Sequence, residues 1–88
     1  MKKSTITDYL DFCLLCGKPN TEIHHCLSGS DRNNADIDGL YIGLCRECHN
    51  FIHQYPQALV MSKIIGQLAY ERKHTREEFR ARYRHSYL

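Results

Sequence analysis

The residue types best suited to chemistry in this chain are cysteine and histidine. Two Cys-x-x-Cys pairs occur, Cys13/Cys16 and Cys45/Cys48. Zinc prefers four tetrahedral ligands, and two such pairs supply four thiolates. The 28 residues between Cys16 and Cys45 are enough for a hairpin that brings the second pair back to the first. The spacing therefore predicts one structural zinc site made of all four cysteines.

Two other interpretations of the cysteines are weaker. The segment from Cys45 to His49 also matches a c-type haem attachment pattern, but haem attachment would leave the first pair unexplained. A thioredoxin-like redox pair needs a βαβ pattern, which the sequence lacks. The fifth cysteine, Cys26, belongs to no pair, and we expect it to be a small buried hydrophobic residue.

Four histidines remain once the cysteines are assigned. His49 and His53 are four residues apart, so on a helix they share one face and can bind one divalent metal together. His24 would be a third ligand. His25 is the neighbour of His24 on an expected strand, so its side chain should point to the other side and act as a general base for water. The alternative is that all four are ordinary surface histidines.

The remaining sequence predicts the elements that must position these groups. The pattern of apolar, turn and capping residues predicts strands over 21–27 and 40–44, a polar loop over 28–38, and helices that begin at Cys45, Pro56 and the capping box Thr75-x-x-Glu78. In the second helix we expect an apolar stripe made of Leu59, Ile64, Ile65, Leu68 and Ala69. The fold class is therefore α+β, with a metal-bearing core over 13–55 and two C-terminal helices over 56–88.

Composition favours a single domain over residues 1–88. Of these residues, 42% are hydrophobic and 25% are charged, which is typical of a globular chain with a thin core that a metal can stabilise. No apolar run approaches the roughly 20 residues of a membrane span, and no secretory signal is recognisable. Five cysteines in a chain without a signal favour a reducing compartment and metal ligation over disulfides, and we expect the cytoplasm of a bacterium or of a phage-infected host.

Charge is distributed unevenly along the chain. The net charge is +2 overall, but five acidic and two basic residues give −3 over 21–55, and six basic and three acidic residues give +3 over 71–88. A basic C-terminal end suits contact with nucleic-acid phosphates, although a solvated helix face explains the charge equally well. The candidate nucleic-acid-binding residues are Arg72, Lys73, Arg76, Arg80, Arg82 and Arg84.

These motifs together resemble the HNH endonuclease superfamily. The resemblance consists of the first cysteine pair, Ile23-His24-His25, a polar loop, and the run from Leu44 to His53, and it covers residues 13–53. Ile65-Gly66-Gln67 makes it similar to small phage or prophage members. The resemblance implies a zinc-stapled treble clef with a ββα-metal core, in which a β-hairpin and a helix hold one catalytic metal.

By resemblance, His25 is the general base, and His24, His49 and His53 surround one divalent ion, Mg, Mn, Ni or Zn. The implied reaction is metal-dependent hydrolysis of phosphodiester bonds in phage or mobile-element DNA, with RNA as an alternative substrate. A double-strand break would need a homodimer, a DNA-processing partner or two separate cleavage events. The family's central Asn has no clear match, and its candidates are Asp31, Asn33, Asn34 and Asp38.

Two functions from other classes stay open at this point. The first is a non-catalytic, zinc-binding, nucleic-acid-binding module on a degenerate HNH scaffold, which would need the cysteines but not the histidines. The second is a protein-interaction adaptor that uses the apolar face of residues 59–69 as its docking surface. Dependence of cleavage on His25 separates the nuclease from both.

Overall fold

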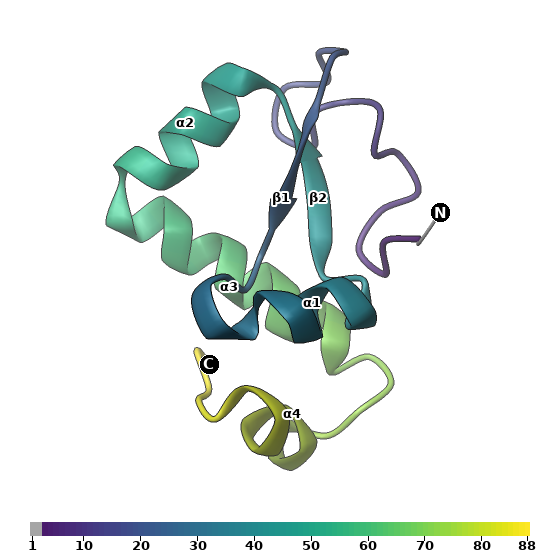
Figure 1. The fold of residues 1–88 in the computed structure, drawn as a ribbon, viewed down its shortest axis with the longest axis vertical. Coiled ribbons are helices and arrows are strands. Elements are labelled where there is room, and N and C mark those ends of the chain that lie inside the picture. Colours follow the sequence, from purple (N-terminus) through teal and green to yellow (C-terminus); the bar gives the residue numbers. More distant parts are fainter. Residues whose placement is uncertain (1–2) are drawn as a thin grey trace.

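The structure, a computed structural model, describes residues 3–88 as a small α+β fold (Figure 1). A two-stranded antiparallel sheet lies between α2 and the N-terminal segment, with α1 below it (Figure 1). Its elements are β1 (Glu22–His25), the 3₁₀ turn η1 (Gly29–Asp31), α1 (Arg32–Asp38), β2 (Tyr41–Leu44), α2 (Arg46–Gln54), α3 (Pro56–Tyr70) and α4 (Arg76–Tyr83). Both strands are shorter than predicted, and they pair from Glu22 opposite Leu44 to His25 opposite Tyr41. Among the helices of residues 3–88, none combines the length and the apolar character needed to cross a membrane.

The connection between the strands is helical, so the prediction of a loop over 28–38 is wrong. Asn33 and Asn34 suggested turns, but Ala35 is completely buried and anchors α1 against Leu40. The helix ends at Gly39, whose φ of 73° lies in the left-handed region that glycine adopts without strain. The amide of Leu40 then donates to the carbonyl of Ala35 at 2.8 Å, which satisfies one of the last helical acceptors.

The predicted helix boundaries after β2 are confirmed. Cys45 is the N-cap of α2, and its sulfur accepts from the amide of Cys48. Tyr55 ends α2 in an extended conformation, and Pro56 begins α3. At α4, Thr75 and Glu78 form the capping box that the sequence predicts.

The expected face of helix α3 is only partly the one that packs. Of the predicted stripe, Ala69 is buried, Leu59, Ile64 and Ile65 are partly buried, and Leu68 is half-exposed. The fully buried residues of α3 include several small ones, and the helix closely approaches Cys26, which directly follows β1. A Cβ added at Gly66 would lie 2.9 Å from the Cβ of Cys26, so the helix depends on glycine there. This close approach also brings Ser62, one turn earlier, beside the strand.

Helix α4 closes the end of the molecule below α1 (Figure 1). Phe79 and Tyr83 are almost completely buried on one face of α4, as their spacing predicts. The carboxylate of Asp38 accepts hydrogen bonds from the Arg82 guanidinium and the Tyr83 hydroxyl. These bonds tie the end of α1 to α4 across 44 and 45 residues of sequence.

Candidate metal centres

The four paired cysteines converge at one point. Cys13 and Cys16 come from the N-terminal segment, and Cys45 and Cys48 from the start of α2, with all four sulfur atoms within 4.8 Å of one another. The sulfurs of Cys16 and Cys45 are 3.6 Å apart. In a tetrahedral zinc site with Zn–S distances near 2.3 Å, sulfur atoms lie about 3.8 Å apart. The cluster therefore has the donors and the dimensions that a structural zinc ion requires.

The close packing of the four thiols shifts the pKa values of Cys13 and Cys48. Burial opposes ionisation of Cys13, but hydrogen bonds from the backbone around Cys45 and Cys16 outweigh it and lower its pKa to about 6. Hydrogen bonding with Cys45, together with burial, raises the pKa of Cys48 to about 12. Four adjacent thiolates repel one another, so full ionisation requires a cation among them. By contrast, Cys26 lies outside the cluster, and burial raises its pKa to about 12, as expected for a core residue.

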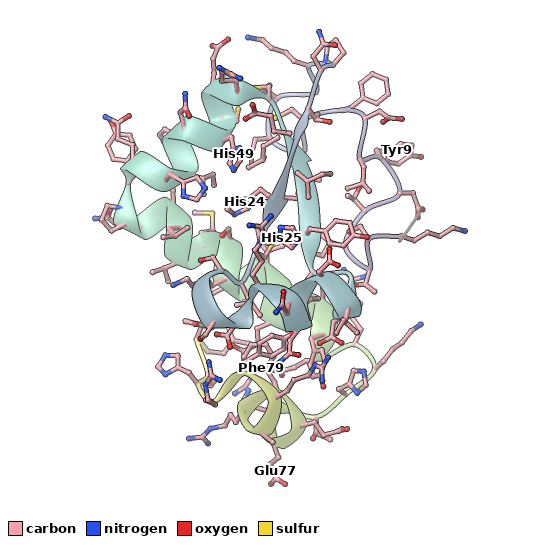
Figure 2. All side chains as sticks on the ribbon, viewed as in Figure 1. Tyr9, His24, His25, His49, Glu77 and Phe79 are labelled. Carbon is pink, nitrogen blue, oxygen red and sulfur yellow. The ribbon has the colours of Figure 1, made fainter. Side chains whose placement is uncertain are left out.

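A second cluster joins three histidines from two elements. His24 on β1 and His49 and His53 on α2 each offer a ring nitrogen, and these nitrogens lie within 4.8 Å of one another. Figure 2 shows His24 and His49 in the space between β1 and α2. Neutral imidazoles suit divalent metals, and three of them leave coordination positions open, as in catalytic zinc sites. The donor set therefore fits the divalent ion that the HNH resemblance implies.

His24 is the buried member of this cluster, with 2% of its surface exposed. Burial lowers its pKa to about 4, and the neighbouring His49 and His53 add to the effect. The ring is therefore neutral near pH 7, which is the form that binds metals. Its Nε2 atom lies 3.1 Å from the hydroxyl of Ser62 on α3.

His49 is held by Glu22, at the start of β1. The Nδ1 atom of His49 lies 3.0 Å from one carboxylate oxygen, and Arg46 donates to the other at 3.2 Å. The hydrogen bond to His49 lowers the pKa of Glu22. Partial burial acts in the opposite direction, and the positive charge of Arg46 lowers the pKa further. Arg46 lies between Cys45 and Cys48 in sequence, so this carboxylate connects the cysteine cluster with the histidine cluster.

His25 stands outside the three-histidine cluster but close to it. Its Nε2 atom lies 3.2 Å from the Oδ1 atom of Asp36 on α1, and its ring contacts Tyr41 across the sheet. The two acidic candidates for the family Asn have other partners, because Asp38 is bonded to Arg82 and Tyr83, and Asp31 to Arg84. The carboxylate that contacts His25 is that of Asp36, which the sequence did not indicate.

One open cavity of about 220 Å³ brings these groups together. The four histidines line it, along with Ile23, Ser28 and Arg32. Strand alternation predicts that His24 and His25 face apart, and His25 is indeed not part of the metal cluster, yet both reach the same cavity. Arg32, at the first turn of α1, is an exposed cation at its edge.

No protein-family model, curated protein or solved structure matches this chain. The assignment of the site therefore depends on its geometry and on the resemblance of its motifs.

The basic C-terminal residues are partly engaged within the fold. Arg76 pairs with Glu71, and Arg72 donates to the carbonyl of Thr5. Arg82 and Arg84 pair with Asp38 and Asp31, as described above. Lys73 and Arg80 are exposed. The cationic face available to a nucleic acid is therefore smaller than the charge count over 71–88 suggests.

Sequence reasoning missed five residues that contact or line the histidine site. They are Glu22, Arg32, Asp36 and Ser62, and Ser28 is a fifth residue that lines the cavity. Asp36 and Arg32 belong to the segment predicted as a loop, where no helical register was available to place them. Ser62 contacts His24 across 38 residues, and no local pattern indicates such a contact.

Proposed function

We propose that this protein is a metal-dependent endonuclease of the HNH type that hydrolyses phosphodiester bonds in DNA. In this proposal, β1, β2 and α2 form the ββα-metal core of a treble clef stapled by one zinc ion on the four cysteines. The resemblance to small phage and prophage members favours a role in the processing of phage or mobile-element DNA.

One observation carries the proposal. Three imidazole nitrogens that can hold a divalent ion lie next to a fourth imidazole, His25, which has its own carboxylate partner. All four histidines line one cavity together with an arginine. A purely structural metal site has no need of an uncoordinated base or of a cation at its open side, whereas hydrolysis of a phosphodiester uses both.

His25 is the proposed general base. Because ionised Asp36 can only accept, the hydrogen bond from His25 Nε2 places the proton on that nitrogen and leaves Nδ1 with its lone pair. His25 Nδ1 can then take a proton from water, and the carboxylate of Asp36 stabilises the imidazolium that results. Asp36 thus performs the orienting role of the family Asn and adds a negative charge.

His24, His49 and His53 would hold the divalent ion, which supplies charge neutralisation for the attacked phosphate and the leaving oxygen. Mg, Mn, Ni and Zn are candidates, and imidazole donors favour Ni and Zn. Arg32 can bind a phosphate oxygen at the edge of the cavity. Two positive charges, the arginine and the metal ion, repel each other unless an anion such as phosphate lies between them.

The proposal is tested by nicking of supercoiled plasmid. Untagged protein that holds one zinc per chain is incubated with Mg, Mn, Ni or Zn, and open circles should accumulate only with added metal. The matched control is a double variant, His49→Ala with His53→Ala, purified identically to reveal contaminating nuclease. Failure of the folded wild type to nick with any of the four metals would refute the proposal.

Arg32→Ala should weaken productive DNA binding at the cavity. Loss of one charged hydrogen bond costs about 1.5–3 kcal/mol, so kcat/KM for nicking should fall about 10- to 100-fold. The comparison is Arg80→Ala, which removes an exposed arginine from α4, away from the cavity. Equal losses in both variants would mean that Arg32 contributes only general positive charge.

A non-catalytic zinc module that grips nucleic acid is the second candidate. It would rely mainly on the basic C-terminal residues, and three of these arginines pair with acidic residues of the fold. The same assay separates the two candidates. Plasmid that is retarded in a gel but never nicked would favour the module over the nuclease.

A further inference from the structure

A buried serine determines which nitrogen of His24 carries the proton. Ser62 has 1% of its surface exposed, and its hydroxyl donates its single proton to the carbonyl of Leu59 at 3.0 Å. The same oxygen lies 3.1 Å from His24 Nε2, and with its proton on Leu59 it can only accept from that nitrogen. In this arrangement, His24 carries its proton on Nε2 and keeps its lone pair on Nδ1.

The carboxylate of Glu22 selects the other tautomer at His49, with the proton on Nδ1. An ionised carboxylate accepts hydrogen bonds and donates none, so the 3.0 Å contact between Glu22 and His49 Nδ1 requires a proton on Nδ1. The lone pair of His49 is then on Nε2. Arg46 holds the second oxygen of Glu22, which restricts rotation of the carboxylate.

We propose that Ser62 and Glu22 are positioning residues for the second metal, which direct His24 Nδ1 and His49 Nε2 toward the ion. This inference rests on the proposed function of the three-histidine cluster as a catalytic metal centre. Histidine ligands commonly donate their other ring N–H to a carboxylate or another acceptor, which fixes the ring and raises its basicity as a ligand. Here one acceptor comes from β1 and the other from α3.

The location of Ser62 supports a role beyond packing. Within residues 3–88, the buried polar side chains are His24, Ser62 and Gln67, and the first two bond to each other. Ser62 reaches His24 because Gly66, one turn later on the same face, allows α3 to approach Cys26. An apolar residue at 62 would pack against the strand but would leave the Nε2–H of His24 buried without an acceptor.

The first test reads the tautomers directly. Long-range ¹H–¹⁵N correlation spectra of the one-zinc protein, without a second metal, distinguish protonated from unprotonated ring nitrogens. We expect His24 protonated on Nε2 alone and His49 on Nδ1 alone. Ser62→Ala and Glu22→Gln should each convert their own histidine to a mixture of tautomers and leave the other unchanged. The opposite tautomer at either wild-type histidine would overturn the proposal.

The second test measures affinity for the metal by titrating Ni²⁺ calorimetrically into the same untagged protein. Loss of an outer hydrogen-bond partner typically costs about 10- to 100-fold in metal affinity, and we expect that loss for both variants. Ser62→Thr keeps the hydroxyl and should restore most of the affinity. Glu77→Gln, which removes an equal charge from the exposed face of α4, is the control. Wild-type affinity in Ser62→Ala and Glu22→Gln would contradict the positioning role.

The outcomes of these measurements distinguish failure of the positioning role from failure of the nuclease proposal. A protein with the expected tautomers and the expected loss of Ni²⁺ affinity, but without nicking, supports the positioning role and refutes the nuclease. A nicking enzyme whose two variants bind Ni²⁺ like wild type overturns the positioning role alone. Wild-type protein that takes up no Ni²⁺ beyond its zinc overturns it as well.

Discussion

Replacing His25 with alanine should almost abolish plasmid nicking and leave the rest of the protein intact. A positioned general base typically contributes about 10²- to 10⁴-fold to the rate, and His25 is the one histidine of the cavity outside the metal cluster. Its side chain is 14% exposed and its ring contacts Tyr41, so we expect a small loss of stability beside the loss of rate. We therefore expect a loss of that size in kcat, measured from initial rates of nicking under saturating metal.

Three measurements on this variant and one control variant distinguish loss of the base from loss of folding or binding. Zinc content, affinity for Ni²⁺ and affinity for DNA should stay close to wild type in His25→Ala. His85→Ala, which removes an exposed imidazole near the C-terminus, should nick at the wild-type rate. If DNA affinity fell as much as cleavage, His25 would be a binding residue and the assignment of the base would be wrong.

Cys48→Ser should unfold the domain or loosen it severely. Zinc binding to small domains of this kind contributes about 10–16 kcal/mol, which is comparable to the entire stability of about 5–15 kcal/mol of a typical domain. The cluster also joins the N-terminal segment to α2, because its ligands come from both. We expect loss of the cooperative thermal transition, followed by circular dichroism, together with loss of bound zinc.

Cys26→Ala is the matched comparison for that variant. It removes a buried thiol that lies outside the metal cluster, so the protein should retain its zinc and lose only about 1–2 kcal/mol of stability through lost packing. A Cys48→Ser protein that lost its zinc but kept the wild-type melting temperature would refute the structural role of the site.

The local parts of the fold were predictable because their information lies within a few residues. The Cys-x-x-Cys spacing, the i, i+4 spacing of His49 and His53, and the capping box at Thr75 each depend on one turn of backbone. The segment over 28–38 misled the prediction for the same reason. Its polar residues resemble a turn, whereas the burial of Ala35 against Leu40 stabilises a helix there.

The sequence by itself therefore determined the two sets of candidate metal ligands, the order of most elements and the α+β class. The tertiary structure alone decided how those ligands are held. Asp36 reaches His25, Glu22 reaches His49, and Ser62 reaches His24 across 11, 27 and 38 residues. Such contacts depend on the distance at which helices and strands pack, which Gly66 sets for α3. A packing distance arises from many side chains at once, so no single motif can encode it.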